Sequence, residues 1–362
     1  MQQKKLTQIL NKNLIKYALG PFLIILSSIL FTFYSGYRGV FPIDSFLIYD
    51  SGYKIINGHL PFKDYWSVTG PLLDYLQFLF FKIFGINWFS YVLHASLINL
   101  FISLLFYYFL IQLNLSRIFS FLYSISISIL AYPSAGTPFA DHHATIISFA
   151  SIMILILAIT KENKIYWVLL PIFLIFSFLS KQIPSSYLFF LFLITIIFNC
   201  YLNNNKNLKN ILLILSTSAF ILIFLILLML YINKIPLKNI WIQYFLFPIE
   251  IGESRFNSIN FDFKKVVLNF KFIYFSLFPL IFVLFKILYI SNKNLKQKKD
   301  ILCTFFLIFS VLIFIYCQVL TKNQILIFFT IPFILGYTHY LSNKYNLTNL
   351  IYTILISILL IS

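Results

Sequence analysis

The sequence predicts an all-α polytopic membrane protein with about 11 transmembrane helices, and two observations carry this prediction. First, 60% of the 362 residues are hydrophobic and only 10% are charged, so too little polar surface remains to cover a soluble domain. Second, apolar runs of about 20 residues, the length that crosses a bilayer, recur along the chain between short lysine-containing loops. We expect a single transmembrane domain over residues 1–362.

Breaks in the apolar runs divide the chain into spans. The expected spans are 17–36, 89–111, 117–133, 143–160, 165–180, 183–202, 210–232, 270–290, 301–320, 325–341 and 348–362. Residues 165–202 are almost continuous, but one helix of that length would be about 57 Å long, so we expect a hairpin near Lys181. Residues 71–85 are apolar but short and carry Asp74 and Lys82, so we expect a helix lying on the membrane surface.

The charges separate between the two ends of this predicted bundle. With 71–85 on the surface, the basic residues of the short loops share one side with the basic N-terminus, which the positive-inside rule makes cytoplasmic. Bilayer orientation thereby explains the net charge of +17, and a nucleic-acid partner is not expected. Only Glu162 and Asp300 fall on this cytoplasmic side. The other acidic residues fall outside: Asp44, Asp50, Asp64, Asp74, Asp141, Glu250, Glu253 and Asp262.

The longest hydrophilic segment, about residues 36–88, forms the first outer loop. Loops of this length are functional or disordered, and its many aromatic residues argue against disorder. Turns are expected at Gly58–Pro61 and at Gly70–Pro71. Carboxylates beside aromatic rings suit a sugar, so Asp64, Tyr65 and Trp66 are candidate substrate-binding residues. The alternative is an aromatic belt at the membrane interface, which by itself explains Tyr65 and Trp66.

Three polar residues further along are candidates with a structural alternative each. Asp141, at the outer end of the fourth span, is either an acid of the site or a helix N-terminal acid stabilised by the macrodipole. Lys181 breaks an apolar run on the outer side, where insertion bias should disfavour a lysine, so it is either a residue of the site or a snorkelling turn residue. Arg255, in the second outer loop at about 233–269, either binds phosphate or is solvated.

His142 and His143 diverge by about 100° on a helix, so they do not suit one metal together.

The first outer loop resembles a known family. The residues that carry the resemblance are Asp44, Gly58-x-x-Pro61-Phe62-x-Asp64, Gly70-Pro71-Leu72 and Phe84-Gly85. This pattern resembles the first outer loop of GT-C-fold glycosyltransferases, the superfamily of protein O-mannosyltransferases and lipid A aminoarabinose transferases. The resemblance is specific over residues 40–85 and architectural elsewhere. The family often has Asp-Glu where this chain has Asp44-Ser45, and the lipid A branch has a lysine before Pro-Pro where this chain has Thr69-Gly70-Pro71.

The resemblance implies a GT-C-like fold, with juxtamembrane helices in the first outer loop, and an inverting glycosyltransferase. It implies transfer of a sugar from a polyprenyl-phosphate donor to a hydroxyl of a glycan, lipid or protein acceptor. Asp44 would be the general base, Asp141 a second catalytic acid, and Lys181 the phosphate contact. No cofactor is expected, and the sequence leaves a divalent-metal requirement open.

We expect the protein in the bacterial inner (plasma) membrane, among membrane lipids. The loop charges predict a cytoplasmic N-terminus, and the active site is expected on the periplasmic or outer side. Two other functions remain as alternatives. A transporter or flippase of lipid-linked glycans would show internal repeats or charges near mid-membrane. An O-antigen-polymerase-like enzyme would carry its main outer loop later in the chain.

Overall fold

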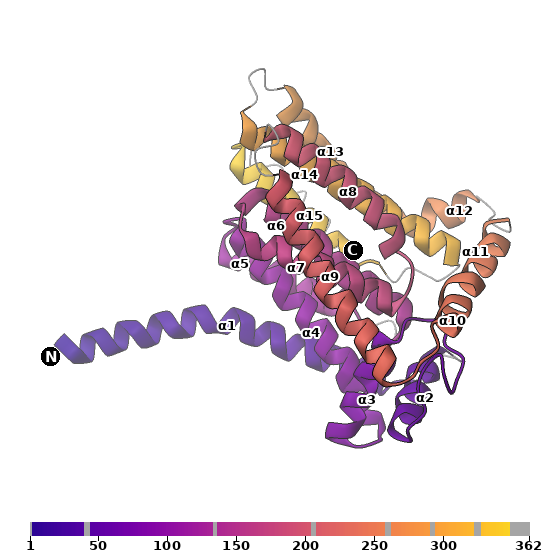
Figure 1. Ribbon diagram of the computed structural model, residues 1–362. Coiled ribbons are helices and arrows are strands. Elements are labelled where there is room, and N and C mark those ends of the chain that lie inside the picture. Colours follow the sequence, from indigo (N-terminus) through magenta and orange to yellow (C-terminus); the bar gives the residue numbers. More distant parts are fainter. Residues whose placement is uncertain are drawn as a thin grey trace.

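The computed structural model describes a bundle of long helices with shorter helices gathered at one end (Figure 1). It describes residues 2–39, 44–132, 136–203, 208–257, 262–289, 294–321 and 327–347, apart from the side chains of residues 1–17 and 41–45. Within these ranges all regular structure is helical. The predicted all-α class is therefore confirmed.

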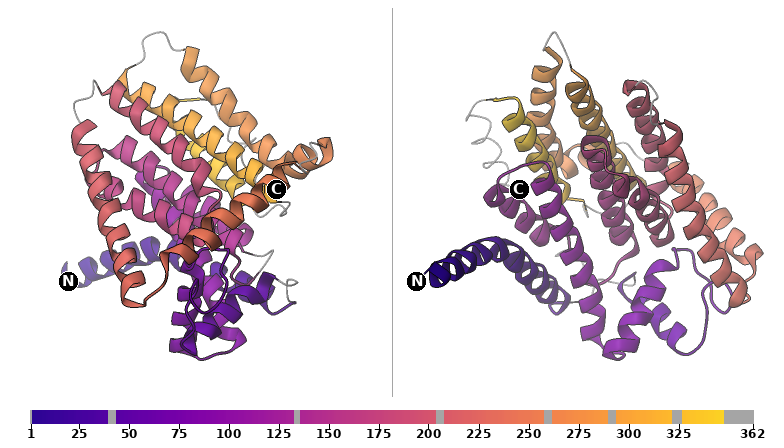
Figure 2. Two further views of the ribbon diagram at one scale, coloured as in Figure 1. Left: turned by 45° about the vertical axis from the view of Figure 1, so that its right-hand side comes forward. Right: turned by 60° about the vertical axis from the view of Figure 1, so that its left-hand side comes forward.

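The long helices follow the predicted spans closely. They are α1 (Gln2–Gly36), α4 (Trp88–Gln112), α5 (Arg117–Leu130), α6 (Ala140–Lys161), α7 (Lys164–Ser180), α8 (Ser185–Leu202), α9 (Leu208–Ile232), α13 (Lys271–Tyr289), α14 (Leu295–Thr321) and α15 (Thr330–Lys344). The expected hairpin is present, because α7 ends at Ser180 and α8 begins at Ser185. Figure 2 shows most of these helices running alongside one another.

Seven helical segments are long and apolar enough to cross a membrane, which makes the chain an integral membrane protein by its helices. They begin at Ala18, Trp88, Ala140, Ser185, Leu208, Phe263 and Leu295. Two further apolar helices, α5 and α7, are shorter, and α15 has only 15 residues. The expected span 348–362 lies outside the described residues. The described residues therefore do not confirm the predicted count of about eleven spans.

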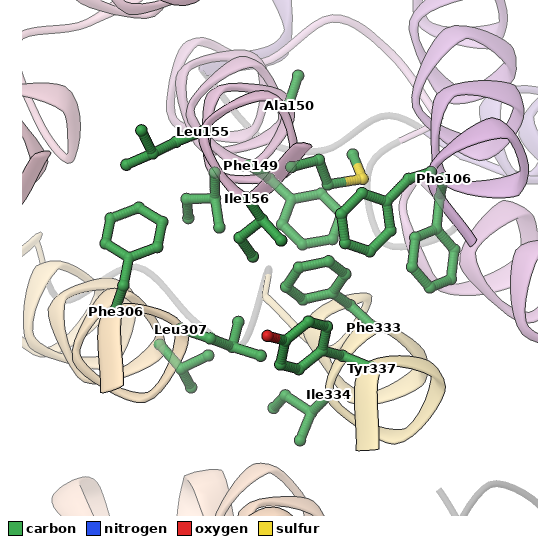
Figure 3. Close-up of a cluster of buried hydrophobic side chains, with 14 of the residues drawn as sticks. Phe106, Phe149, Ala150, Leu155, Ile156, Phe306, Leu307, Phe333, Ile334 and Tyr337 are labelled. Carbon is green, nitrogen blue, oxygen red and sulfur yellow. The ribbon is translucent and has the colours of Figure 1, made fainter. Parts of the chain in front are cut away.

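Helix α6 is the central helix of the bundle. Almost every side chain from Ala140 to Ile159 is buried, and the helix packs against α4, α7, α8 and α14. Figure 3 shows the core where α6 meets α4, α14 and α15, with Phe149 among Phe106, Phe333 and other large apolar side chains. Burial on all sides explains why α6 carries apolar residues around its whole circumference and has no continuous polar face.

Small polar residues join the helices inside the bundle. Asn99 of α4 donates from Nδ2 to Thr32 Oγ1 of α1 at 3.0 Å and to the carbonyl of Ser128 in α5 at 2.8 Å. Ser27 Oγ lies 2.7 Å from Ser128 Oγ. Such hydrogen bonds between small polar side chains are a common means of associating helices in a membrane.

The first outer loop folds into two short helices, α2 (Asp44–Ile56) and α3 (Leu72–Phe84), which lie at the lower end of the bundle in Figure 1. Helix α3 begins after Pro71 and ends at Gly85, whose φ is 81°. Its 13 residues span only about 20 Å at 1.5 Å per residue, too short to cross a bilayer. The expected helix at 71–85 is present as Leu72–Phe84, and its position on the membrane surface stays a prediction.

The second outer loop is more ordered than its sequence indicated. Residues expected as a long loop at 233–269 form α10 (Leu237–Ile240), a π-helical segment (Trp241–Leu246), α11 (Phe247–Asn257), α12 (Phe263–Val266) and a 3₁₀ turn (Leu268–Phe270). The first three elements follow one another without a break. This helical arm, residues 237–257, lies beside the first outer loop and forms one wall of a cavity that Asp141 and Lys181 also line.

Candidate functional site

A cavity of about 1020 Å³ lies at the end of the bundle where the outer loops gather. Its walls come from the first turns of α2 and α6, the α7–α8 turn, the π-helical segment with α11, and the last residues of α14. Four charged residues line it: Asp141, Lys181, Glu253 and Arg255. Most of the remaining lining is apolar, so charges are concentrated in a largely apolar chamber.

An ion pair in the wall joins Asp141 to Lys181. Asp141 is the second residue of α6, where the helix macrodipole favours a carboxylate, and Lys181 is the C-cap residue of α7. The Lys181 ammonium contacts Asp141 Oδ1, and the two side chains are 18% and 8% exposed. The structure thus brings together two candidates that are 40 positions apart.

Packing between α6 and α7 fixes the two partners of this ion pair. Ser177 Oγ donates to the carbonyl of Ala144 at 2.8 Å and lies 2.5 Å from Ser148 Oγ. These contacts lie about one turn below the ion pair on each helix. They hold the two helices close together. Helix packing therefore places Asp141 next to Lys181, and the ion pair alone does not have to align the two helices.

Gln182, which the sequence analysis did not identify as a site residue, ties three walls of the cavity together. Its Nε2 donates to the carbonyl of Val68 in the first outer loop at 3.0 Å and to that of Tyr244 in the π-helical segment at 2.9 Å. Gln243 Oε1 in turn accepts from the Ser67 N–H at 3.0 Å. The only signal for this role in the sequence was that Gln182 is a polar residue next to Lys181.

Gly70 brings the first outer loop against the end of α7. Its N–H donates to the carbonyl of Ser180 at 3.0 Å, and a Cβ at this position would lie 1.6 Å from the carbonyl oxygen of Leu179. A residue with a side chain cannot approach so closely. The glycine of the Gly70-Pro71 pair therefore sets the distance between the loop and Lys181.

Arg255 also lies at the cavity, on α11, together with Glu253. Arg255 is half-buried, whereas Glu253 is exposed. The sequence analysis left Arg255 open between a phosphate contact and a solvated loop residue. Both residues belong to α11, so this segment is a helix that lines the cavity and not the irregular loop that the sequence indicated.

Asp44 is the first residue of α2, and its side chain lies outside the described residues. Leu47 and Ile48, which line the cavity, come three and four positions later and share a helix face with position 44. Position 44 therefore lies one helical turn from the cavity wall.

The other candidates of the first outer loop do not line this cavity. Asp64 is exposed and closes a turn, because its Oδ2 accepts from the Leu60 N–H at 2.8 Å. Trp66 is 54% exposed, and its ring stacks edge-on against Phe247 at 5.5 Å. Tyr65 points away from the cavity to the α2–α3 pair.

Tyr65 bonds to a buried acid, Asp74, that the sequence indicated only as a surface-helix residue. Its hydroxyl donates to Asp74 Oδ2 at 3.0 Å, and Asp74 is 1% exposed. Burial raises the pKa of Asp74 to about 7, although the Tyr65 hydrogen bond opposes the rise. Burial and the neighbouring carboxylate also raise the pKa of Tyr65.

A chain of polar contacts connects α3 to the first turns of α6. Gln77 Oε1 lies 2.9 Å from His94 Nδ1, His94 Nε2 lies 3.2 Å from His143 Nε2, and His143 Nδ1 contacts the Tyr132 hydroxyl. His143 Nδ1 also lies 3.3 Å from the carbonyl oxygen of Phe139. The sequence analysis noted His143 but not its partner, which lies 49 positions away.

In the described part of the chain, no group of three His, Cys, Asp or Glu side chains lies close enough together to bind a metal ion. His143 is engaged by His94 and Tyr132 instead.

The family resemblance receives no independent test from other proteins. Comparisons with family models, curated proteins and solved structures give no match to this chain.

Proposed function

We propose that this protein is a membrane glycosyltransferase that moves a sugar from a polyprenyl-phosphate donor to an acceptor hydroxyl at the outer end of the bundle. The observation that carries the proposal is the Asp141–Lys181 ion pair in the wall of a large and mostly apolar cavity. A lipid-linked sugar has the matching chemistry, because it joins an apolar chain to a phosphate and a sugar.

The apolar part of the cavity suits the isoprenoid chain. Phe190 of α8 and Phe256 of α11 line the cavity and are 65% and 60% exposed. Apolar side chains that both line a chamber and reach the surface of a membrane helix offer a route for a lipid. The chain of the donor would lie between α8 and α11.

The charged part suits the phosphate and the reacting hydroxyl. In transfer, the acceptor oxygen forms a bond to the anomeric carbon, the bond from that carbon to the phosphate oxygen breaks, and the polyprenyl phosphate leaves with the electron pair. Lys181 and Arg255 would stabilise the charge that develops on the leaving phosphate. We propose that Lys181 exchanges Asp141 for the phosphate when the donor binds.

A carboxylate has to take the proton of the attacking hydroxyl. Asp44 is proposed as this base, because position 44 stands one helical turn before the cavity wall, and Asp141 as the acid that orients the acceptor or shares the base role. Asp64, Tyr65 and Trp66 lie outside the cavity and are not needed for these steps. The proposed location is the bacterial plasma membrane, with the N-terminus cytoplasmic and the cavity outside.

The test is transfer by the purified full chain, in a bilayer, from a labelled polyprenyl-phosphate sugar. We expect product from the wild type and none from Asp44→Asn, with the variant inserted and folded as the wild type. Normal product from Asp44→Asn would overturn the role of Asp44. Movement of the intact lipid-linked sugar across the bilayer without transfer would instead favour a flippase.

A further inference from the structure

A second cavity, of about 990 Å³, lies at the opposite end of the bundle. Helix α6 runs from one cavity to the other, with Asp141 lining the first and Lys161 the second. Its 22 residues extend about 33 Å at 1.5 Å per residue, which is close to the hydrocarbon thickness of a bilayer. The two cavities therefore lie at the levels of the two headgroup layers.

The second cavity is lined mainly by charged and amide side chains. Its charged residues are Lys161, Glu162, Lys296, Lys299, Asp300 and Lys344. Four lysines against two acids leave an excess of positive charge. No part of the proposed sugar transfer uses these residues.

Two of the lysines are already neutralised by the two acids. Lys344 Nζ lies 2.7 Å from Asp300 Oδ2, and Tyr345 donates to the same oxygen at 2.6 Å. Lys299, which is almost fully buried, contacts Glu162. These pairs form the rigid floor of the cavity.

The other two lysines supply the charge excess. Lys161, at the end of α6, and Lys296, in the first turn of α14, are exposed, and neither makes an ion pair with any described residue. They lie on different helices but line one cavity. Two ammonium groups on one chamber make a site for a phosphate anion.

The surroundings favour a lipid as the source of that phosphate. Leu113, Leu115 and Leu295 line the same cavity, and Leu295 is 43% exposed on the bundle surface. A headgroup at this level would place its phosphate at the lysines and its acyl chains along the helices. Basic pockets between transmembrane helices bind anionic lipids in this way.

We propose that this cavity binds the phosphodiester headgroup of an anionic phospholipid, held by Lys161 and Lys296 above the floor of paired charges. The proposal rests on the lining of the cavity and is independent of the sugar transfer proposed for the other end.

The experiment measures binding of phosphatidylglycerol and phosphatidylcholine to the purified full chain in detergent by native mass spectrometry. We expect the wild type to prefer phosphatidylglycerol, and Lys161→Gln/Lys296→Gln to bind it about tenfold more weakly. The matched control is Lys164→Gln/Lys298→Gln, which removes two exposed lysines of the same end that do not line the cavity. The control should change binding less than about twofold, because such charges act only through screened attraction.

Three results would overturn the proposal. An equal loss in both double variants would mean diffuse attraction to a basic surface, and a wild type without preference would mean no headgroup site. Displacement of the lipid by millimolar glycerol phosphate would mean a site for a soluble anion. Because all four substituted lysines are exposed, circular dichroism should show unchanged helix content, and Lys161→Arg/Lys296→Arg should retain binding if the charges act as proposed.

Discussion

The two cavities at the ends of α6 have similar volumes, about 1020 and 990 Å³, but opposite linings. The cavity at Asp141, called the outer cavity, has a mostly apolar lining with the Asp141–Lys181 pair in its wall. The cavity at Lys161, called the inner cavity, is lined mainly by charged and amide side chains, among them the Lys344–Asp300 pair. Volume is therefore a poor guide to the ligand, and the placement of charge is a better one. An amphiphile with a long chain suits the first cavity, and a headgroup alone suits the second.

The comparison also separates two uses of a lysine–carboxylate pair. Asp300 is 1% exposed, and both Lys344 and Tyr345 donate to it. A buried carboxylate with two donors is typical of a contact that stabilises the fold. Asp141 and Lys181 border a chamber large enough for a ligand. We infer that the inner pair stabilises the fold and the outer pair takes part in the reaction.

The largest expected effect is that of Asp141→Asn on sugar transfer. Loss of a carboxylate that handles the acceptor proton should reduce the rate about 10²–10⁴-fold. The free energy of unfolding should fall by less than about 2 kcal/mol, because Lys181 lines a cavity that can admit water. Rates in a reconstituted bilayer and unfolding in detergent measure the two effects. A large loss of stability with full activity would reverse the roles assigned to the two pairs.

Asp300→Asn should have the complementary effect. Removal of one partner of a buried pair costs about 3 kcal/mol, so unfolding should be easier while the transfer rate per folded molecule stays unchanged. Asp50→Asn is the control, because both side chains of the Lys54–Asp50 ion pair are exposed, at 40% and 55%, and its loss should cost less than about 1 kcal/mol. Equal effects of the two substitutions would contradict the structural role of Asp300.

Much of the fold could be predicted from the sequence, because a helix that crosses a bilayer must be apolar and about 20 residues long. The hairpin at Lys181, the short helix at 71–85 and the separation of Glu162 and Asp300 from the other acids all come from the length of a span and the charge of the loops. The juxtaposition of Lys181 with Asp141 was expected only through a resemblance.

The remaining parts depend on contacts that no local pattern encodes. The arm at 237–257 is helical because it packs against the first outer loop, as the Gln243–Ser67 hydrogen bond illustrates. Tyr65 lies next to Asp74 rather than at the cavity, because α2 and α3 pack together and bury that carboxylate. The side chain of Asp44 and the last expected span lie outside the described residues.

Gly70→Ala would test how the outer cavity is assembled. A Cβ would meet the carbonyl of Leu179, so the loop must move away from α7, at a cost of about 1–3 kcal/mol. Gly39→Ala, where a Cβ meets nothing within 4 Å, is the control and should be within about 0.5 kcal/mol of the wild type. The measurement is chemical or thermal unfolding of both variants. Equal stability of both would show that the loop does not depend on this close approach.

Asp74 should make the outer end pH-sensitive. Its folded pKa of about 7 lies above the ordinary value of 3.8, so its contribution to stability is fully present below about pH 4 and is lost as the pH rises through about 7. Within that window it should reduce the free energy of unfolding by at most about 1.4 kcal/mol per pH unit. Unfolding between pH 4 and 8 should show this slope in the wild type. Asp74→Asn should remove it, and an unchanged slope would assign the pH dependence to another group.

The most direct test of the central claim is the rate of a single turnover from a polyprenyl-phosphate sugar with Lys181→Gln. The matched control is Lys82→Gln, which removes an exposed lysine of the same end that does not line the cavity. We predict a rate at least about 100-fold lower for Lys181→Gln and a wild-type rate for Lys82→Gln. Wild-type turnover by Lys181→Gln, or no turnover by the wild type with any polyprenyl-phosphate sugar, would contradict the assignment of the cavity to sugar transfer.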